Sequence, residues 1–484
     1  MSDNLPEELL IEILTRVPVK SLICFTLVCK SWYGLITSPN FITTHLTKIH
    51  TEKIPNNPSL LLIRRYTKDD KKEHYTINVD DEEDGHENGG GNGQFAKKSV
   101  ELDFPFKSLI GYFRIVGTCN GLICLSDDLF GTTKPIILWN PSVRKSVTSP
   151  APTINPPLPY MFVLGFGADS SQDYKVVRIV YHRDGQFDFL LPPEVEVYSL
   201  SMGFWRRLIN VGIKVCIADF LWSQAFVNGA VHWIAYHPRG SDNDSGSFGS
   251  LILGFDMDNE VFNEIMLPDD LAHELATNLC ITVYKGSLAV IKYPRWEDNG
   301  SCSVWVMEDY GVWESWTQLY AIDLVQGMEK VVGFRKNGDV FVAKESKGLV
   351  LYNPKTGFTE DLGIWGSTRS FYIYNFEETL ILFERQNAVV EEEEEFGDAR
   401  AFQENGGIDL DEEPSRNEDY FDAQETLIGN KQVRTLAFPA VVGIVILKVL
   451  QHLLLDVSSF YWEVLQLWIT DGLANFYVSG QGRY

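Results

Sequence analysis

Residues 5–18 read LPEELLIEILTRVP, and residues 19–32 continue VKSLICFTLVCKSW. In the first stretch apolar residues recur every three or four positions, which predicts an amphipathic helix with one apolar stripe. The stripe consists of Leu5, Leu9, Ile13, Leu14 and Val17. Pro18 should end this helix, because its ring cannot continue the hydrogen-bond ladder.

The second stretch predicts a second helix that Ser21 caps and that ends before Pro39. It carries apolar residues from Leu22 through Trp32 to Leu35. Two or three helices of this length bury too little apolar surface to be stable alone. We therefore expect the rest of the chain, or a partner, to cover them.

These residues closely resemble the F-box of plant F-box proteins. The shared pattern runs from Leu5 to Leu22, with Val-Cys-Lys-Ser-Trp at 28–32 and Pro-Asn-Phe at 39–41, and covers about the first 45 residues. The resemblance implies docking onto the Skp-type adaptor of a Skp–cullin–F-box ubiquitin ligase. One local departure is the sequence ICFT at 23–26, where many relatives carry arginines.

On this interpretation ten residues contact the adaptor: Leu5, Pro6, Leu9, Ile13, Leu14, Val17, Pro18, Leu22, Val28 and Trp32. Glu8, Glu12 and Lys20 are expected at the polar rim of that contact. The alternative is that the same stripe packs against the rest of the chain.

From about residue 95 to residue 384, short apolar and aromatic runs alternate with Gly, Asn, Asp and Pro, which favours an all-β sandwich, barrel or propeller. Five runs centre on an aromatic residue, and successive centres lie 59, 57, 50 and 47 residues apart. These centres are Trp139, Tyr198, Phe255, Trp305 and Tyr352. The spacing is close to the roughly 50-residue repeat of kelch-like propeller blades.

An inner-strand candidate precedes each centre, at residues 121–125, 173–179, 229–234, 286–291 and 338–342. A sixth blade can combine residues 370–374 and 378–383 with an early strand at 60–63. Pairing the first strand with the last closes the ring and removes open sheet edges. We therefore expect about six blades.

This region also resembles the F-box-associated, kelch-like interaction domain of plant F-box proteins. The similar stretches are VGTCNGLICL at 116–125, LWNPS at 138–142, LGFGAD at 164–169, DYKVV at 173–177 and VNGAVHW at 227–233. The resemblance implies a module that recruits a target protein. Aromatic and arginine residues on three loops are candidates for the target surface. They are Tyr160, Tyr236, Arg239, Arg295 and Trp296.

The expected organisation is an F-box at 1–45, a linker at 46–58 and the propeller at 59–386, with a disordered loop at 80–94. An acidic disordered segment follows at 387–432, since residues 387–426 hold fifteen acidic and two basic side chains. The tail at 433–484 includes an apolar run, 436–455, that is nearly long enough to span a bilayer. Lys448 within it argues against a membrane span, and the alternatives are a helix packed on the propeller or a tail foreign to the family fold; the sequence leaves all three open.

The net charge of −25, from 41 basic and 66 acidic residues, argues against nucleic-acid binding. Seven scattered cysteines and the lack of a signal peptide indicate the cytoplasm or nucleus. We find no pattern typical of a zinc or other metal site, a cofactor-binding site or a catalytic residue set. Residues 181–185, YHRDG, share three letters with the catalytic loop of protein kinases, but the other kinase motifs do not accompany them. We expect a non-catalytic ligase subunit that binds the adaptor, through it cullin, and an unidentified target; the alternative is a non-degradative kelch-like scaffold.

Overall fold

The computed structural model describes residues 7–51, 60–80, 99–108, 111–127, 135–155, 160–182, 189–218, 223–238, 249–294, 301–323 and 327–384. All of them belong to the first of two compact units, which spans residues 1–389. The predictions for residues 81–94 and 387–484, including the apolar run at 436–455, lie outside the described residues. Within the described ranges, no helix is both long and apolar enough to cross a membrane.

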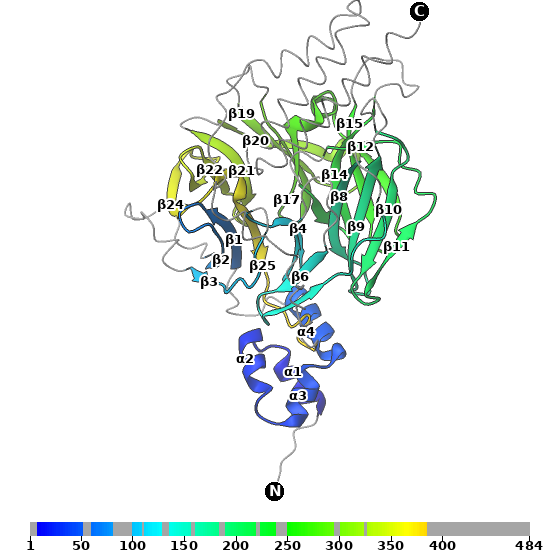
Figure 1. Ribbon diagram of the computed structural model, residues 1–484. Helices are drawn as coiled ribbons and strands as arrows, with labels where there is room; N and C mark the ends of the chain where they lie inside the picture. Colours follow the sequence, from blue (N-terminus) through cyan, green and yellow to red (C-terminus); the bar gives the residue numbers. More distant parts are fainter. Residues whose placement is uncertain are drawn as a thin grey trace, which may run out of the picture. The chain divides into compact units, whose positions relative to one another are not determined.

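Four helices form the N-terminal domain (Figure 1). They are α1 (Glu7–Leu14), α2 (Val19–Phe25), α3 (Lys30–Ile36) and α4 (Pro39–Thr51). The predicted stop at Pro18 is confirmed, but the expected cap at Ser21 is wrong, because α2 already begins at Val19 directly after the extended Pro18. The expected second helix is two helices, since Cys29 is fully extended, with φ −163° and ψ 166°, and breaks the run.

The helical domain also extends past its expected boundary at residue 45. Helix α4 continues to Thr51, so the first six residues of the predicted linker are helical. His45 connects α4 to the rest of the domain. Its Nε2 lies 3.1 Å from the Val17 carbonyl oxygen, and this hydrogen bond links α4 to the turn after α1. Burial lowers the pKa of His45.

The rest of the described chain forms a six-bladed β-propeller, as expected, each blade an antiparallel sheet. Blade 1 contains β4 (Arg114–Cys119), β5 (Leu122–Ser126), β6 (Ile136–Asn140) and β7 (Lys145–Thr148). Blade 2 contains β8 (Tyr160–Ala168), β9 (Tyr174–His182), β10 (Glu194–Ser199) and β11 (Phe204–Leu208). Blade 3 contains β12 (Cys216–Ile217), β13 (Ala225–Val227), β14 (Ala230–Tyr236), β15 (Ser250–Asp256) and β16 (Phe262–Met266), and the short helix α6 (Asp269–Ala272) follows it.

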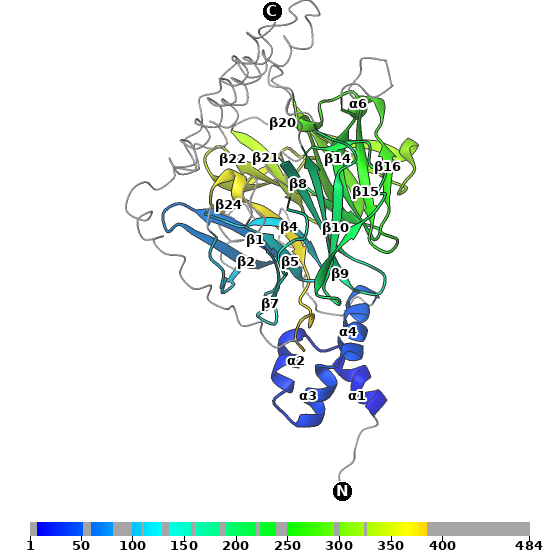
Figure 2. The same ribbon diagram turned by 45° about the vertical axis from the view of Figure 1, so that its right-hand side comes forward.

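Blade 4 contains β17 (Leu279–Tyr284), β18 (Ser287–Lys292), β19 (Ser301–Met307) and β20 (Trp316–Asp323). Blade 5 contains β21 (Met328–Phe334), β22 (Val340–Lys344), β23 (Gly348–Tyr352) and β24 (Thr359–Trp365). Blade 6 combines β25 (Tyr372–Phe376) with β1 (Leu60–Thr67), β2 (Lys72–Val79) and β3 (Val100–Glu101). The ring closes where the yellow β25 lies beside the blue β1, with Leu60 opposite Phe376 (Figures 1 and 2).

Two details of the expected blades differ from the structure. The five aromatic centres all lie on the third strand of a blade, but the candidates for inner strands are the second strands. Asn120 and Gly121, with φ of 50° and 76°, form the hairpin turn that joins β4 to β5. The strand before this turn, β4, is not among the expected strands.

Residues 378–383 are not a strand of blade 6. Asn140, at the end of β6, donates its Nδ2–H to the carbonyl oxygens of Thr379, at 3.1 Å, and Ile381, at 2.8 Å. These bonds hold residues 377–384, which we call the strap, along the edge of blade 1. The loop expected at 80–94 also needs a correction at its first residue, because Asp80 is buried and forms an ion pair with Arg335.

A buried ion pair fixes blade 2. Arg178 on β9 and Glu196 on β10 are cross-strand neighbours, and Nη1 lies 2.7 Å from Oε1. Arg178 also donates to the Ile154 carbonyl oxygen at 2.7 Å, while Glu196 accepts bonds from the Thr153 hydroxyl and backbone N–H. The pair therefore ties the chain between blades 1 and 2 to the middle of the blade 2 sheet.

His232 on β14 is fully buried between blades 3 and 4. Its Nδ1 lies 3.1 Å from the Ala225 carbonyl oxygen, and its Nε2 lies 2.8 Å from the Tyr310 hydroxyl. The Ala225 carbonyl oxygen can only accept a hydrogen bond, so Nδ1 carries a proton and donates to it. In the neutral ring Nε2 then accepts from the Tyr310 hydroxyl, so the neutral ring fits both partners. Burial lowers the pKa of His232 to about 4.

We expect this histidine to make the propeller less stable in mild acid. The unfolded chain, with a histidine pKa of about 6.5, takes up the proton before the folded chain does. The contribution is therefore complete above pH 6.5 and is lost as the pH falls toward 4, amounting to about 2 kcal/mol between pH 7.5 and pH 5. Urea unfolding at these two pH values should show a smaller pH dependence for His232→Asn than for the wild type. An equal dependence in both proteins would contradict a neutral buried ring.

The strand connections define the two faces of the propeller. In blades 1, 2, 4 and 5 the turns between strands one and two and between strands three and four lie on one face, because neighbouring strands are antiparallel. The turns at residues 120–121 and 141–144 are on this face, next to the strap. The connections between strands two and three, and those between blades, emerge on the opposite face.

Candidate functional site

The first candidate site is the surface of the four N-terminal helices. Leu14, Val19, Leu22, Ile36 and Phe41 are all buried and form a small core. Two of these residues, Leu14 and Leu22, were expected to contact the adaptor. That assignment needs correction, because they support the surface from beneath rather than form it.

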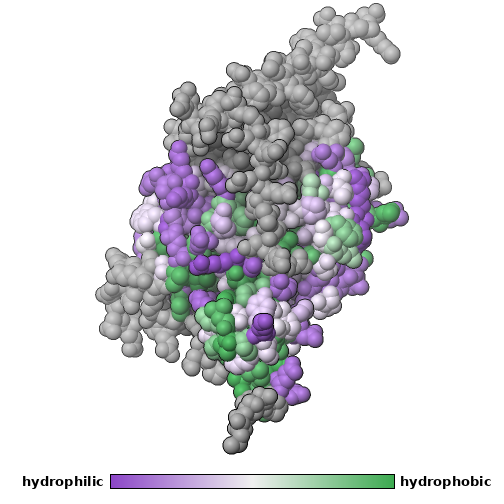
Figure 3. Space-filling view, turned by 60° about the horizontal axis from the view of Figure 1, so that its bottom comes forward, coloured by the Kyte–Doolittle hydropathy of each residue, from purple (hydrophilic) through white to green (hydrophobic). Residues whose placement is uncertain are grey.

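Leu9 and Ile13 occupy the opposite side of α1. Their side chains are 53% and 54% exposed, although they lie one helical turn apart on the same face. Val28, in the turn between α2 and α3, is 62% exposed. Figure 3 brings this end of the molecule forward and shows apolar residues gathered there. The structure thus leaves three of the ten expected contact residues as an uncovered apolar surface.

Two further apolar side chains of the helical domain are exposed and were not among the expected contacts. Leu27 is 88% exposed beside Val28, and Tyr33 on α3 is 56% exposed. The break between α2 and α3 turns Leu27 outward, whereas a continuous helix would have carried it on the apolar face. The extended residue at this break has no strong turn signal in the sequence, which is why these two positions were missed.

The remaining expected contacts are mixed. Trp32 is half-buried and packs edge-to-face on Phe25, with ring centroids 5.5 Å apart. Val17 is half-buried and Pro18 is exposed. Leu5 and Pro6 lie outside the described residues.

Charged residues border the apolar surface. Glu12 forms ion pairs with Arg16 at 2.6 Å and with Lys48 of α4 at 2.7 Å. The hydrogen bond from Lys48 lowers the pKa of Glu12. Lys20 was expected at the same rim but instead lies 3.1 Å from Glu378 of the strap. It belongs to the connection with the propeller.

The strap joins the helices to the propeller. Its Leu380 and Leu382 are buried in one apolar cluster with Leu46 of α4 and with Tyr174 and Leu200 of blade 2. His50 at the end of α4 lies 3.0 Å from Glu377, and this hydrogen bond raises the pKa of His50. Apolar packing and two ion pairs therefore hold the exposed face of α1 in a set position beside blades 1 and 2.

The second candidate site was the set of aromatic and arginine residues on the propeller loops. Tyr160 is buried, with its ring 6.3 Å from that of Phe162, and is therefore part of the core rather than an open surface. Tyr236 is half-buried at the end of β14. Arg239, Arg295 and Trp296 lie outside the described residues. Of the five positions the structure describes only Tyr160 and Tyr236, which lie at strand ends on the face opposite the helices.

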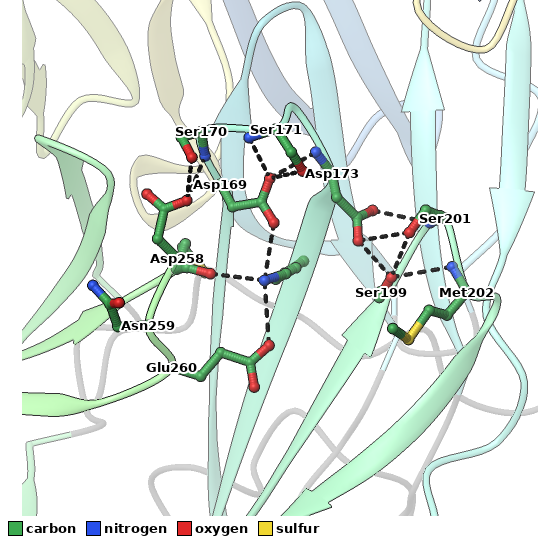
Figure 4. Close-up of polar contacts among 12 residues, drawn as sticks. Asp169, Ser170, Ser171, Asp173, Ser199, Ser201, Met202, Asp258, Asn259 and Glu260 are labelled. Atoms are coloured by element: carbon green, nitrogen blue, oxygen red, sulfur yellow. Dashed lines mark hydrogen bonds and ion pairs between the residues drawn. The ribbon is translucent and has the colours of Figure 1, made fainter.

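A groove of about 490 Å³ separates α4 from the turns of blade 2 and the end of the strap. Polar side chains on its wall bind one another (Figure 4). Lys175 lies 3.0 Å from Asp169 and 3.2 Å from Glu260, and Asp173 accepts bonds from the hydroxyls of Ser199 and Ser201. Lys175 is thus paired with two carboxylates and Asp173 is held by two serines, which indicates a structural role in shaping the two hairpin turns.

Among the described residues, no group of three or more His, Cys, Asp or Glu side chains could hold a metal ion. Burial raises the pKa of Cys119 and of Cys302 to about 12, so neither thiol is activated as a nucleophile. What the helices offer instead is an apolar surface on a rigid support.

Comparison with known proteins agrees with this division. Residues 2–44 match the F-box domain, and residues 95–390 match the F-box associated beta propeller domain. An F-box protein of Arabidopsis thaliana is 27% identical over 79% of this chain and 93% of its own length. An F-box/kelch-repeat protein of the same plant is 28% identical over 73% and 89%, and the F-box protein CPR1 is 26% identical over 72% and 79%. The chain therefore belongs to the F-box proteins that carry an F-box associated beta-propeller domain.

Proposed function

We propose that this chain is the substrate-recognition subunit of a Skp–cullin–F-box ubiquitin ligase. Its helices bind a Skp-type adaptor, which connects it to cullin, and its propeller binds a target protein. The subunit acts by bringing the target close to the ubiquitin-carrying enzyme and performs no chemistry itself. Holding both partners on one rigid body raises the effective concentration of target lysines at the ligase.

The observation that carries the proposal is the exposure of Leu9 and Ile13. Two large aliphatic side chains at consecutive turns of one short helix are left in water, although the core beneath them is well packed. Had the apolar stripe served to attach the helices to the propeller, these side chains would be covered. The strap and α4 make that attachment instead, which leaves this face of α1 for a partner.

A Leu9→Asp/Ile13→Asp double variant should lose adaptor binding by at least about 100-fold. The new carboxylates would have to be buried, without a cation, in an apolar interface. Because both positions are exposed, the variant should keep the thermal stability of the wild type. Isothermal titration with a purified Skp-type adaptor would measure the loss.

A matched control is Met202→Asp/Val261→Asp, which places the same charges at propeller positions that are 59% and 54% exposed. This control should bind the adaptor like the wild type. If the Leu9→Asp/Ile13→Asp variant retains adaptor binding, the docking assignment is wrong and a non-degradative scaffold becomes the better proposal.

We place target recognition on the propeller face opposite the helices, where the connections between blades emerge. We place the protein in the cytoplasm or the nucleus, which agrees with seven cysteines that are all free thiols. Affinity capture from cells with the proteasome blocked tests the division of labour between the helices and the propeller. Proteins captured by the full chain and by a chain without residues 1–45 are target candidates, and proteins lost with the deletion belong to the ligase.

A further inference from the structure

Residues 308–315, EDYGVWES, connect β19 to β20 in blade 4, and we call them the Trp313 loop. Three adjacent large apolar side chains of this loop are exposed: Tyr310 by 37%, Val312 by 45% and Trp313 by 52%. Exposed aromatic residues of this kind are typical of protein–protein contact surfaces. The proposed contact with the adaptor does not use this loop, and the proposed target face is the opposite one, since the turn between the third and fourth strands of blade 4 lies on the other side.

The Trp313 loop is rigid despite its exposure. The Ser315 hydroxyl lies 2.9 Å from the Asp309 carbonyl oxygen and 2.7 Å from that of Val312, and it accepts a bond from the Asp309 backbone N–H at 3.1 Å. The Ser315 N–H donates to the Val312 carbonyl oxygen at 3.0 Å. These bonds close the loop on itself at both ends.

Blade 3 anchors the same loop from outside. The Tyr310 hydroxyl bonds to the buried His232 at 2.8 Å, and the neighbouring Trp316 donates its indole N–H to the Met266 carbonyl oxygen at 3.2 Å. A partner would therefore meet a preformed surface and would not have to order the loop on binding. Preorganisation of this kind reduces the entropic cost of association.

The loop is acidic, and the segments of blades 3 and 4 around it carry more acidic than basic side chains, although Glu260 is paired with Lys175 and Arg206, and Glu274 with Lys292. Residues 249–284 contain seven Asp and Glu but no Lys or Arg, and residues 301–323 contain four Asp and Glu but no Lys or Arg. Glu308, Asp309 and Glu314 in the loop are all exposed. Asp256 of blade 3 adds to the effect of burial in raising the pKa of Tyr310, which shows that this carboxylate is close to the loop.

We propose that the Trp313 loop is a docking site for a basic, partly apolar segment of another protein. Lysine or arginine side chains of the partner would pair with Glu308, Asp309 and Glu314, and an apolar side chain between them would pack on Trp313 and Val312. An arginine could also stack on the Trp313 ring, a contact in which a cation meets the negative face of an aromatic system.

Charge decides among the possible occupants. A second copy of this chain would bring the same acidic surface to the symmetric contact, and like charges would face each other. Anionic lipid headgroups and nucleic-acid phosphates would be repelled for the same reason. A basic protein segment is the occupant that complements both the apolar side chains and the carboxylates.

The test uses the full chain and a fluorescent synthetic peptide of alternating arginine and leucine residues, followed by anisotropy at physiological salt. Trp313→Ala should weaken peptide binding by about tenfold or more. Trp365→Ala is the matched control, because Trp365 on β24 is 53% exposed but has Arg65 beside it, bonded to its carbonyl oxygen. The control should leave binding unchanged.

A second pair of variants separates the charges from the ring. Glu314→Lys should weaken binding of the basic peptide, whereas Glu345→Lys, at an exposed position in blade 5, should not. A peptide with glutamate in place of arginine should not bind. The Leu9→Asp/Ile13→Asp variant should bind the basic peptide like the wild type, so failure of this proposal is distinguishable from failure of adaptor docking.

Three outcomes would overturn the proposal. The first is no binding of the basic peptide by the wild-type chain, and the second is equal weakening by Trp313→Ala and Trp365→Ala. The third is self-association in sedimentation velocity that Trp313→Ala abolishes, since the occupant would then be a second copy of the chain.

Discussion

Arg178→Met should destabilise the propeller by about 3–5 kcal/mol, which is the usual cost of removing one partner from a buried ion pair. The Glu196 side chain is fully buried, so its carboxylate would remain in the interior without its cation. The Ile154 carbonyl oxygen would also lose the hydrogen bond from the guanidinium. Urea unfolding at neutral pH measures the change in the free energy of unfolding.

Two further variants show whether the buried charge causes this loss. Arg178→Met/Glu196→Gln removes the charge but keeps an oxygen that can accept from Thr153, so it should recover part of the stability. Arg206→Met breaks the ion pair between Arg206 of blade 2 and Glu260 of blade 3, but Arg206 is 47% exposed and the expected loss is below about 1 kcal/mol. Similar losses for Arg178→Met and Arg206→Met would contradict the assignment of the buried pair as a structural centre.

Gly121→Ala should cost about 2–4 kcal/mol, the second large effect that we expect. Gly121 has φ +76°, where an alanine is strained, and a Cβ atom there would overlap the Glu377 carbonyl oxygen and lie 2.9 Å from the Thr379 hydroxyl. The substitution therefore acts on the strap as well as on the turn. Thermal and urea unfolding would both report it.

Gly203→Ala isolates the backbone part of this effect. Gly203 has φ +78°, but no atom lies within 4 Å of the position that a Cβ would take. Only the strain should remain, at about 1 kcal/mol. If Gly121→Ala and Gly203→Ala lower the free energy of unfolding equally, the strap moves aside at little cost. It then does not fix the helices to the propeller.

Periodicity and turn signals in the sequence predicted the helices, the repeating blades and the closure of the ring. They failed where a distant residue decides the local structure. The apolar run at 378–383 looks like a strand, but Asn140, nearly 240 residues earlier, draws it into the strap. Asp80 precedes an acidic run and looks solvated, yet its partner is Arg335. A single sequence gives no sign of either pairing.

The candidate site on the helices was predictable in part, for a related reason. All five residues of the apolar stripe fit one amphipathic helix, and helical spacing alone cannot say which of them the neighbouring helices cover. Packing around Ile36 and Phe41 buries Leu14, and the strap and α4 attach the domain without using Leu9 or Ile13. Tertiary packing thus divides the stripe into a core half and an exposed half.

Ring closure also sets the order of events during protein synthesis. Leu60 on β1 pairs with Phe376 on β25, and 316 residues separate them along the chain. At a ribosomal rate of about 5–20 residues per second, the first strand waits on the order of tens of seconds before its partner leaves the exit tunnel. The four helices precede β1 and emerge before any blade is complete, but the strap that holds them follows β25. The nascent chain therefore gains its adaptor-facing helices first and their fixed position last.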